Sequence, residues 1–542
     1  MLLALTASLA IVVGDHASVR STPRSTATEL TTLWQGDVVE IRGEQAEYLR
    51  VYSYRRERGG YLRNESVRKV AFTEADAPSL LAVMRFLRDT PGSEALGISY
   101  GAAYLKAVPP RALTTEAFDA IGQMAERLAD TASGNGTQAH SASVAARLEV
   151  VSQFGVRMRS FERNGRMQVC YDGELYRSLL AQPAATAEQQ AHAVLGLTRS
   201  DCIEPETGLT ARAALDEERR DLLERVQDTN LTPVTRSRVR ARRAAVWSAI
   251  TFAQARRGQA AGAAAQRALA ELAGVRAVDL GETYQSEYSD AVLRVSAIRW
   301  AAAAPPNGQM NPAAVLGATQ AAPAAALPVG LAAAPAAANA APVALAASLA
   351  PATAAPFAQT GPAARGSVAT LTLASTTGTT GAFAFNTASG AEPGQTCLTL
   401  EQSSSQRPKA TLARRCTFGI IWLASAQVIP QASALVLSVQ PLEGWRELWV
   451  FHPIAGKWLV DVLSPGLDEP DQGYVEYAGF APGTSRILLV REVKERARYR
   501  RWFEEVRLED LVLVRQASAP ELLRDFGRWQ DVRWRRETLA LR

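Results

Sequence analysis

The spacing of hydrophobic and polar residues divides the chain into three folded regions. From 8 to 70, short stretches rich in Val, Ile, Tyr and Leu alternate with Gly, Asp and Ser turns. From 76 to 300 apolar residues recur at helical spacing, and from 366 to 516 short runs alternate between apolar and polar residues. Alternation is typical of strands, whereas the longer repeat is typical of helices. The chain is therefore predicted to be multidomain: a small β-barrel over 10–72, a mainly helical domain over 76–300 and an antiparallel all-β domain over 366–518.

The helical region contains one segment with a different pattern. Residues 79–88 and several later segments carry apolar side chains on a helical period. Residues 156–169 instead alternate around Asn164 and Gly165, a dipeptide that favours a tight turn between two strands. We expect a β-hairpin at 154–171 within an otherwise helical domain.

Two further segments have unusual composition. Residues 301–364 contain no Asp, Glu, Lys or Arg and are mostly Ala and Pro. Such a segment has no amphipathic face, and proline interrupts any long helix, so we expect a semi-extended linker over 301–365 that lets the two ends sample many separations. The tail at 519–542 is rich in Arg and Trp, and we expect it to pack at an edge of the β domain.

The basic charge changes this picture little. The formal net charge is +5, but only five residues are lysine and the rest of the basic count is arginine, as in a GC-rich bacterial coding sequence. The densest basic run, 236–243, opens a predicted helix, and a nucleic-acid helix would need base-reading or stacking residues beside such a run. A solvated helix face is the commoner explanation of such a run, so no nucleic-acid partner is expected.

The four cysteines fall as two pairs, each within one predicted domain. An even count in a chain with a signal-like start is typical of disulfides in an oxidising compartment. A zinc site would need close C-x-x-C spacing or neighbouring histidines. Neither pair has that spacing, and the histidines are His16, His140, His192 and His452. We expect disulfides, no metal site and no cofactor.

Four cysteines allow three pairings, and we favour Cys170 with Cys202 and Cys397 with Cys416. The two helices predicted between the first pair would form an antiparallel hairpin with the cysteines at its open end. The polar loop 401–409 separates the second pair, so strands on either side would bring these cysteines together. Crossed pairings would have to join separate domains across the Ala/Pro linker.

The N-terminal residues MLLALTASLAIVV are apolar and rich in small side chains, like the end of a secretory signal. They lack a basic n-region and a full apolar core. We expect a signal-like remnant at 1–9 and a signal that begins upstream. No run in the sequence reaches the ~18 uninterrupted apolar residues of a membrane span. The protein is therefore predicted to be exported, to the periplasm of a Gram-negative bacterium, without a transmembrane segment.

The stretch GISYG at 97–101 fits the G-x-S-x-G pattern of serine hydrolases. An elbow serine follows a buried parallel strand and needs several βαβ units around it. Here the stretch follows a helix end and a turn at 89–92 and lies in the helical region. We expect Ser99 not to be a nucleophile and its glycines to serve turns or close helix packing. No catalytic residue is predicted.

The N-terminal region resembles the bacterial SH3 (SH3b) family. The resemblance rests on Val19-Arg20-Ser21 with Pro23, Leu33 with Gly36-Asp37-Val38-Val39, Tyr48-Leu49-Arg50-Val51 and Gly60-Tyr61-Leu62. It implies an SH3-like barrel in an exported protein, where several members bind cell-wall peptidoglycan or short peptides and others are spacers. The candidate ligand-binding residues are the aromatic residues Trp34, Tyr48, Tyr52, Tyr54 and Tyr61, because rings give large contact area. The alternative is that some of them fill the barrel core.

The all-β region shows a second, weaker resemblance, over 434–516. Residues 477–490 are similar to the inter-strand turn of bacterial TolB-like propellers, although the Asp of that pattern is missing. The region is too short for a closed propeller by itself. Blade-like sheets and a sandwich both remain open.

These features favour a non-catalytic exported envelope protein that binds or scaffolds at the cell wall. Its SH3b-like domain would contact peptidoglycan or an envelope peptide or protein, and the separate β domain would contact a second partner. The alternative is an envelope hydrolase, acting on peptidoglycan or peptide, that the SH3b-like domain only targets. Hydrolases of the cysteine type need a free thiol beside a histidine base, which paired cysteines do not supply.

Overall fold

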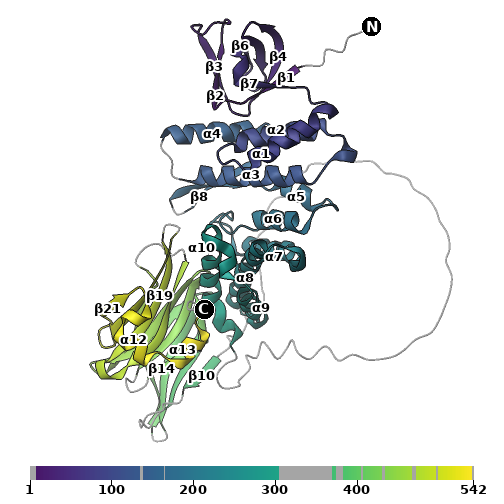
Figure 1. Cartoon of the computed structure of the whole chain (residues 1–542). Coiled ribbons are helices and arrows are strands. Elements are labelled where there is room, and N and C mark those ends of the chain that lie inside the picture. Colours follow the sequence, from purple (N-terminus) through teal and green to yellow (C-terminus); the bar gives the residue numbers. More distant parts are fainter. Residues whose placement is uncertain are drawn as a thin grey trace, which may run out of the picture.

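The computed structural model describes residues 8–134, 138–163, 165–303, 369–373, 382–404, 407–429, 434–466, 472–495 and 498–539. An antiparallel β-sheet, a set of helices and a group of β-sheets follow one another along the molecule (Figure 1). Most of the predicted Ala/Pro linker lies outside the described residues; its first two residues end the short helix η5 (Arg299–Ala302).

Seven strands form the N-terminal sheet. They are β1 (Ser8–Val12), β2 (His16–Arg20), β3 (Glu29–Trp34), β4 (Val38–Gln45), β5 (Tyr48–Ser53), β6 (Arg58–Arg63) and β7 (Val67–Val70), in the antiparallel order β3-β2-β6-β5-β4-β1-β7. Alternate side chains such as Val19, Leu49 and Val51 share one buried core, as the two-residue period of strands requires. Strand β1 starts at Ser8, so Ser8 and Leu9, at the end of the predicted signal-like segment 1–9, pair with β4.

The middle of the chain is helical, with one hairpin. The elements are α1 (Ala77–Arg88), α2 (Glu94–Ala107), α3 (Glu116–Ser133), α4 (Gln138–Ser152), β8 (Met158–Arg163), β9 (Arg166–Tyr171), α5 (Glu174–Leu180), α6 (Ala187–Leu197), α7 (Leu209–Glu224), α8 (Pro233–Arg256), α9 (Gly262–Ala273) and α10 (Ala277–Ile298). The expected hairpin is confirmed, since β8 and β9 pair antiparallel. Capping residues in the sequence fix where several helices begin. Thr186 caps α6 in a capping box, and Thr232 caps α8, which has Pro233 in its first turn.

The C-terminal region holds two larger sheets. One contains β10 (Ala369–Leu373), β11 (Ala382–Ser389), β12 (Thr396–Ser404) and β13 (Arg407–Thr417). The other contains β14 (Ile420–Ile429), β15 (Ala434–Leu442), β16 (Trp445–Ile454), β17 (Lys457–Leu463), β18 (Gln472–Ala481), β19 (Arg486–Glu495), β20 (Arg498–Arg507) and β21 (Leu513–Ala517). The sheets pack face to face, because Phe385 and Leu398 of the first share a core with Leu437 and Phe451 of the second. The C-terminal region is therefore an all-β region built from several sheets, as the alternation predicts.

The β region is not wholly antiparallel, contrary to the prediction. β16 and β18 run parallel where Trp445 pairs with Gly473 and Arg446 pairs with Tyr474. The cause lies in β17, which forms a hairpin with the far half of β16, from Leu448 onward. The chain then returns to the beginning of β16 before β18 starts.

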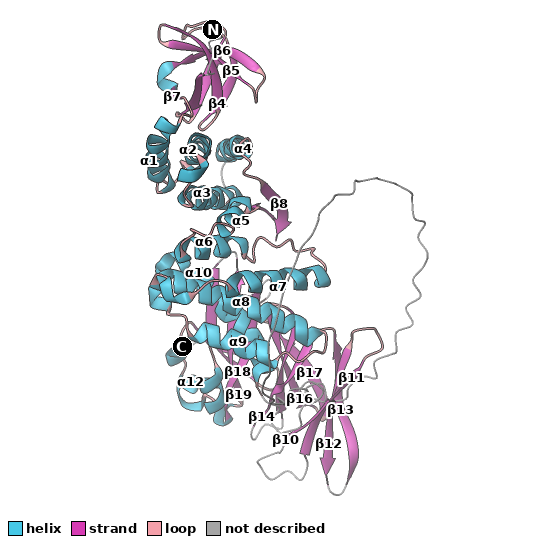
Figure 2. Ribbon diagram, turned by 90° about the vertical axis from the view of Figure 1, so that its right-hand side faces the viewer, coloured by secondary structure: helices cyan, strands magenta, loops and turns pink. Residues whose placement is uncertain are grey.

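The helical and β regions pack against each other, contrary to the expectation that a linker lets the two ends sample many separations. Figure 2 shows α8 and α9 lying across the C-terminal strands, and α10 contacts β18. Trp300 at the end of the helices shares an apolar cluster with Trp422 of β14 and Leu539 of the tail. The two regions therefore form one body.

The tail was expected at a sheet edge and lies instead on a sheet face. It forms the helices α12 (Arg524–Trp529) and α13 (Val532–Glu537). Phe526 and Trp534 are buried against Val490 of β19 and Phe503 of β20. The large apolar side chains explain the difference, because an edge strand offers too little apolar surface to cover them.

Candidate ligand-binding sites

The structure brings together some of the five aromatic residues singled out in the sequence. Tyr52 and Tyr54 form an edge-to-face pair with ring centroids 5.1 Å apart, and Tyr54 is 65% exposed. Tyr61 of β6 lies opposite Arg50 of β5 in the same sheet. Tyr48 is buried, and Trp34 is half-buried against the core of the first helices. Of the five, Tyr52 and Tyr54 therefore form a ring pair at the surface, in which Tyr54 is exposed and Tyr52 is half-buried.

Charged side chains hold this pair of rings in place. The Arg42 guanidinium lies 4.0 Å from the centroid of the Tyr52 ring. Glu40 accepts hydrogen bonds from Arg42 Nε at 2.7 Å and from the Tyr54 hydroxyl at 3.2 Å. The hydrogen bond from Arg42 is the main cause that lowers the pKa of Glu40. We call Glu40, Arg42, Tyr52 and Tyr54 the tyrosine patch.

Ser99 lies in the middle of α2, not on a strand-to-helix turn, and it is buried. Its Oγ donates to the backbone oxygens of Gly36 and Ala95, each at 2.8 Å. Gly36 has a φ of +92°, and a Cβ there would come within 2.6 Å of that Oγ. The serine therefore fastens the β3–β4 turn of the N-terminal sheet to α2.

Both expected cysteine pairs are disulfides in the structure. Cys170 at the end of β9 is bonded to Cys202, with Cα atoms 5.7 Å apart, and the helix pair α5–α6 lies between them in the chain. Cys397 and Cys416 are bonded across directly paired positions of β12 and β13. Two disulfides fit an exported protein.

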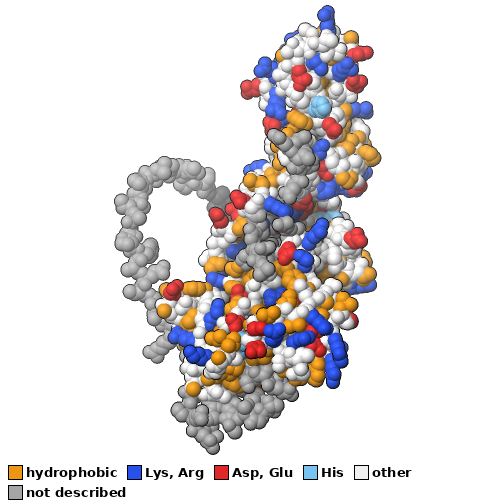
Figure 3. All heavy atoms as spheres, turned by 90° about the vertical axis from the view of Figure 1, so that its left-hand side faces the viewer, with side chains coloured by type: hydrophobic (Ala, Val, Ile, Leu, Met, Phe, Trp, Pro, Cys, Tyr) orange, Lys and Arg blue, Asp and Glu red, His pale blue; other side chains and the backbone are white. Residues whose placement is uncertain are grey.

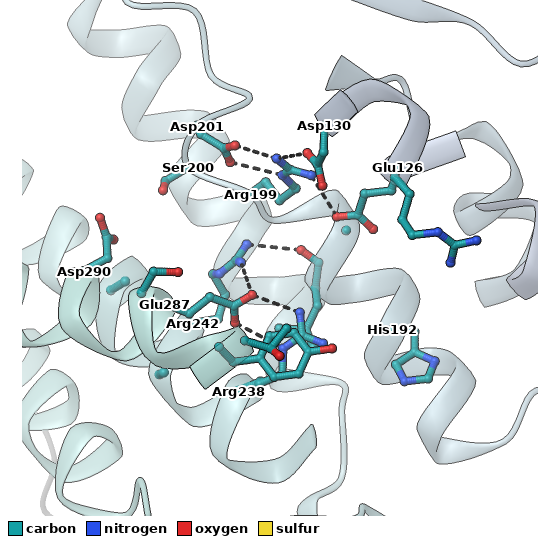
Figure 4. A pocket seen from close by; sticks show the side chains of 18 of the residues that line it. Glu126, Asp130, His192, Arg199, Ser200, Asp201, Arg238, Arg242, Glu287 and Asp290 are labelled. Atoms are coloured by element: carbon teal, nitrogen blue, oxygen red, sulfur yellow. Dashed lines mark hydrogen bonds and ion pairs between the residues drawn. The ribbon is translucent and has the colours of Figure 1, made fainter. Parts of the chain in front are cut away.

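A pocket of about 680 Å³ opens between the helices and the C-terminal sheet. Its lining comes from α3, α5, α6, α8 and α10, from the loop 199–201, and from Lys494 and Tyr499 at the adjoining ends of β19 and β20. We call this the waist pocket (Figure 4). Its volume lies within the ~300–1,000 Å³ range of small-molecule sites.

One wall of the waist pocket is built around Arg199. Its guanidinium lies 3.2 Å from Glu126, 2.7 Å from Asp130 and 2.6 Å from Asp201. Burial raises the pKa of Asp130 despite the nearby guanidinium. Burial also opposes ionisation of Asp201, but its bond to Arg199 prevails and lowers the pKa to about 2. Three carboxylates therefore share a single guanidinium.

The facing wall is built around Glu287 of α10. Arg238 binds both of its carboxylate oxygens, at 2.9 and 3.2 Å, and stacks 3.9 Å from the Tyr284 ring centroid. Arg242 lies 4.0 Å from Glu287, and its Nη1 donates to the backbone oxygen of Leu195 at 3.1 Å. Burial would raise the pKa of Glu287, but the charges of Arg242 and Arg238 outweigh it and lower the pKa.

The waist pocket was missed in the sequence, and the basic run 236–243 was misinterpreted as a solvated face. Arg238 and Arg242 line the pocket, and Arg243 is buried. The guanidinium of Arg243 binds the backbone oxygen of Leu223 and the carboxylate of Asp228. One signal in the sequence could have indicated the pocket. Glu126 and Asp130 of α3 are four residues apart, as are Arg238 and Arg242 of α8, and this spacing places each pair on one face of its helix.

Other features of the described residues give no further site. Within the described ranges, no group of three or more His, Cys, Asp or Glu side chains is placed to hold a metal ion. No helix among these residues combines the length and apolarity needed to cross a membrane. On the face shown in Figure 3, Lys and Arg side chains lie among Asp and Glu side chains. No family model, curated protein or solved structure matches the chain.

Proposed function

We propose that this chain is a non-catalytic, periplasmic binding protein that attaches to peptidoglycan or a wall-associated peptide through its N-terminal unit. The tyrosine patch carries the proposal. It places the exposed ring of Tyr54 and the half-buried ring of Tyr52 beside a guanidinium and a carboxylate, which combines apolar contact area with groups that orient a polar ligand.

Ion pairs join the N-terminal unit to α4, which favours a pre-formed binding surface. Arg55, in the turn after Tyr54, pairs with Asp37 at 2.8 Å and with Glu149 of α4 at 2.7 Å. Arg56 pairs with the same Glu149 at 3.2 Å. A pre-organised surface loses less conformational entropy when it binds a ligand.

An SH3b-like barrel is part of the proposal. In support, core side chains that belong to the motifs of that family, namely Val19, Leu33, Leu49, Val51 and Leu62, meet in one cluster. The seven short antiparallel strands are of the kind that small barrels use. In this proposal the β region, packed on the helices, supports the N-terminal unit and does not bind a second partner separately.

Co-sedimentation of the purified full chain with peptidoglycan sacculi tests the proposal. We expect the protein to pellet with sacculi, and the double variant Tyr52→Ala/Tyr54→Ala to bind about tenfold more weakly, a change of about 1.4 kcal/mol. Phe86→Ala is the matched control, because Phe86 is an aromatic residue of α1 that is 71% exposed. It should pellet like the wild type.

Two outcomes would count against the proposal. Equal pelleting of wild type and patch variant would remove the patch as the binding surface. Release of soluble wall fragments by the wild type, measured chromatographically, would favour the hydrolase alternative. The burial of Ser99 and the bonding of all four cysteines argue against that result.

A further inference from the structure

We propose that the waist pocket binds a small zwitterion, a molecule with an ammonium group and a carboxylate, such as a free amino acid or a short peptide. This site is separate from the tyrosine patch. The inference rests on the way charge is distributed over the two walls of the pocket.

The first wall carries excess negative charge. Glu126, Asp130 and Asp201 surround Arg199, so three carboxyl groups face one guanidinium. Arg127, which also lines the pocket, is paired with Glu94. The side chains of Asp130 and Asp201 are 51% and 46% exposed, whereas that of Arg199 is 16% exposed. The surplus charge is therefore accessible to a ligand, and the compensating guanidinium lies behind it. An ammonium group fits this wall.

The second wall carries excess positive charge. Arg238 and Arg242 share Glu287, and Arg238 already occupies both carboxylate oxygens. Asp290 and Lys494, which also line the pocket, pair with each other. Within the described part of the chain, Arg242 makes a single hydrogen bond, to Leu195. Most of its N–H groups therefore remain to donate. A guanidinium matches the planar, two-oxygen geometry of a carboxylate.

The two walls face each other. Figure 4 shows the group around Arg199 above the group of Arg242, Glu287 and Arg238. Here the excess has opposite sign on the two walls, so the pocket is dipolar.

A dipolar pocket discriminates by charge. A simple anion would be attracted by Arg242 but repelled by the carboxylates around Arg199, and a simple cation would meet the opposite arrangement. A neutral ligand would displace water from both walls without compensating either charge, which is unfavourable in a partly buried site. A zwitterion compensates both walls at once.

Calorimetric titration of the full chain tests the inference. The ligands are an alanine tripeptide with both termini free, the same tripeptide N-acetylated, the same tripeptide C-amidated, and free alanine. We expect the free tripeptide to bind and either blocking group to weaken it by about tenfold or more. Free alanine tests whether the ligand is an amino acid or a peptide. Alanine that binds as tightly as the tripeptide identifies an amino-acid site, and alanine that binds more weakly identifies a peptide site.

Variants assign each end of the ligand to a wall. Asp130→Asn should weaken the free tripeptide about tenfold and leave the N-acetylated one unchanged. Arg242→Gln should weaken the free tripeptide and leave the amidated one unchanged. Arg111→Gln is the control, since its side chain is 80% exposed on a different part of the surface. Because the Asp130 side chain is half exposed, Asp130→Asn keeps the test valid even if Arg242→Gln fails to fold.

Several results would overturn the inference. They are equal binding of free and blocked tripeptides, no saturable heat with alanine or any tripeptide, or displacement of the bound tripeptide by inorganic phosphate alone. The last would show that the positive wall acts by itself as an anion site. None of these results changes the expected co-sedimentation, which depends on the N-terminal unit.

Discussion

Replacement of Glu476 by Gln should loosen the junction between the helices and the C-terminal sheet. The Glu476 carboxylate in β18 is buried, and one of its oxygens binds both Arg299 of η5 and Arg446 of β16. The other oxygen accepts hydrogen bonds from Trp534 Nε1 at 3.0 Å and from the Thr538 hydroxyl at 3.4 Å. The substitution keeps the size of the side chain but leaves two buried guanidiniums without their carboxylate.

The magnitude follows from this burial. The side chains of Glu476, Arg299 and Arg446 are 3%, 7% and 0% exposed. Removing one partner of a buried ion pair typically destabilises a protein by about 3–5 kcal/mol, because the remaining charge stays buried and unpaired. We expect the free energy of unfolding to fall by that amount. Burial already lowers the pKa of Arg446 to about 10, which shows how poorly solvated that cation is.

The same prediction has a pH dependence. Burial would raise the pKa of Glu476, but the charges of Arg299 and Arg446 outweigh it and lower the pKa from its ordinary 4.5. A carboxylate with a lowered pKa in the folded state stabilises the fold above the unfolded-state pKa and loses this effect as pH falls through the folded-state pKa. The difference between wild type and Glu476→Gln should therefore be full near neutral pH and shrink below pH 4.5.

Chemical denaturation followed by tryptophan fluorescence measures the effect, since Trp534 contacts Glu476 directly. Glu74→Gln is the control: it breaks an exposed pair with Arg111 and should change stability by about 1 kcal/mol or less. A loss below about 1 kcal/mol for Glu476→Gln, or a loss that does not shrink in acid, would refute the reasoning. It would mean that water or another group compensates the two guanidiniums.

Two other predictions concern Ser99 and the disulfides. Ser99→Ala should lower the free energy of unfolding by about 1 kcal/mol, because it removes the hydrogen bond to Gly36. A fluorophosphonate probe should leave wild-type Ser99 unlabelled, and labelling would establish it as a nucleophile. Peptide mapping without reduction should recover Cys170 linked to Cys202 and Cys397 linked to Cys416. Free thiols or a crossed link would contradict this pairing. Replacing Cys170 and Cys202 by Ala should destabilise the fold by about 3–4 kcal/mol, as expected from the loop that this bond closes.

Local features of the fold were predictable because their causes are close together in the sequence. Asn164 and Gly165 are neighbours in the sequence, and the expected hairpin is formed by β8, which ends at Arg163, and β9, which begins at Arg166. The pairing of Cys170 with Cys202 needed only two short helices between them. Alternation of apolar residues defined most strands in the same way.

The charged sites were not predictable because their partners are distant in the chain. Glu476 is 177 residues from Arg299, and the predicted linker lies between them. Arg199 collects carboxylates from α3 and from its own loop. A sequence pattern shows that a helix face is charged, but not whether solvent or an opposite charge covers it. This is why the arginines of α8 were taken for a solvated face.

The small residues of the GISYG stretch are explained by helix packing and not by catalysis. Residues four apart lie on one face of a helix, and a residue midway between them lies on the opposite face. In α2, Gly97 and Gly101 share a face against α3, where added Cβ atoms would overlap Met124 and Ile121. Ser99 faces the other way and binds Gly36 of the N-terminal sheet. Each small residue is therefore accounted for by a close contact, since α2 is held between two neighbours that both approach its backbone.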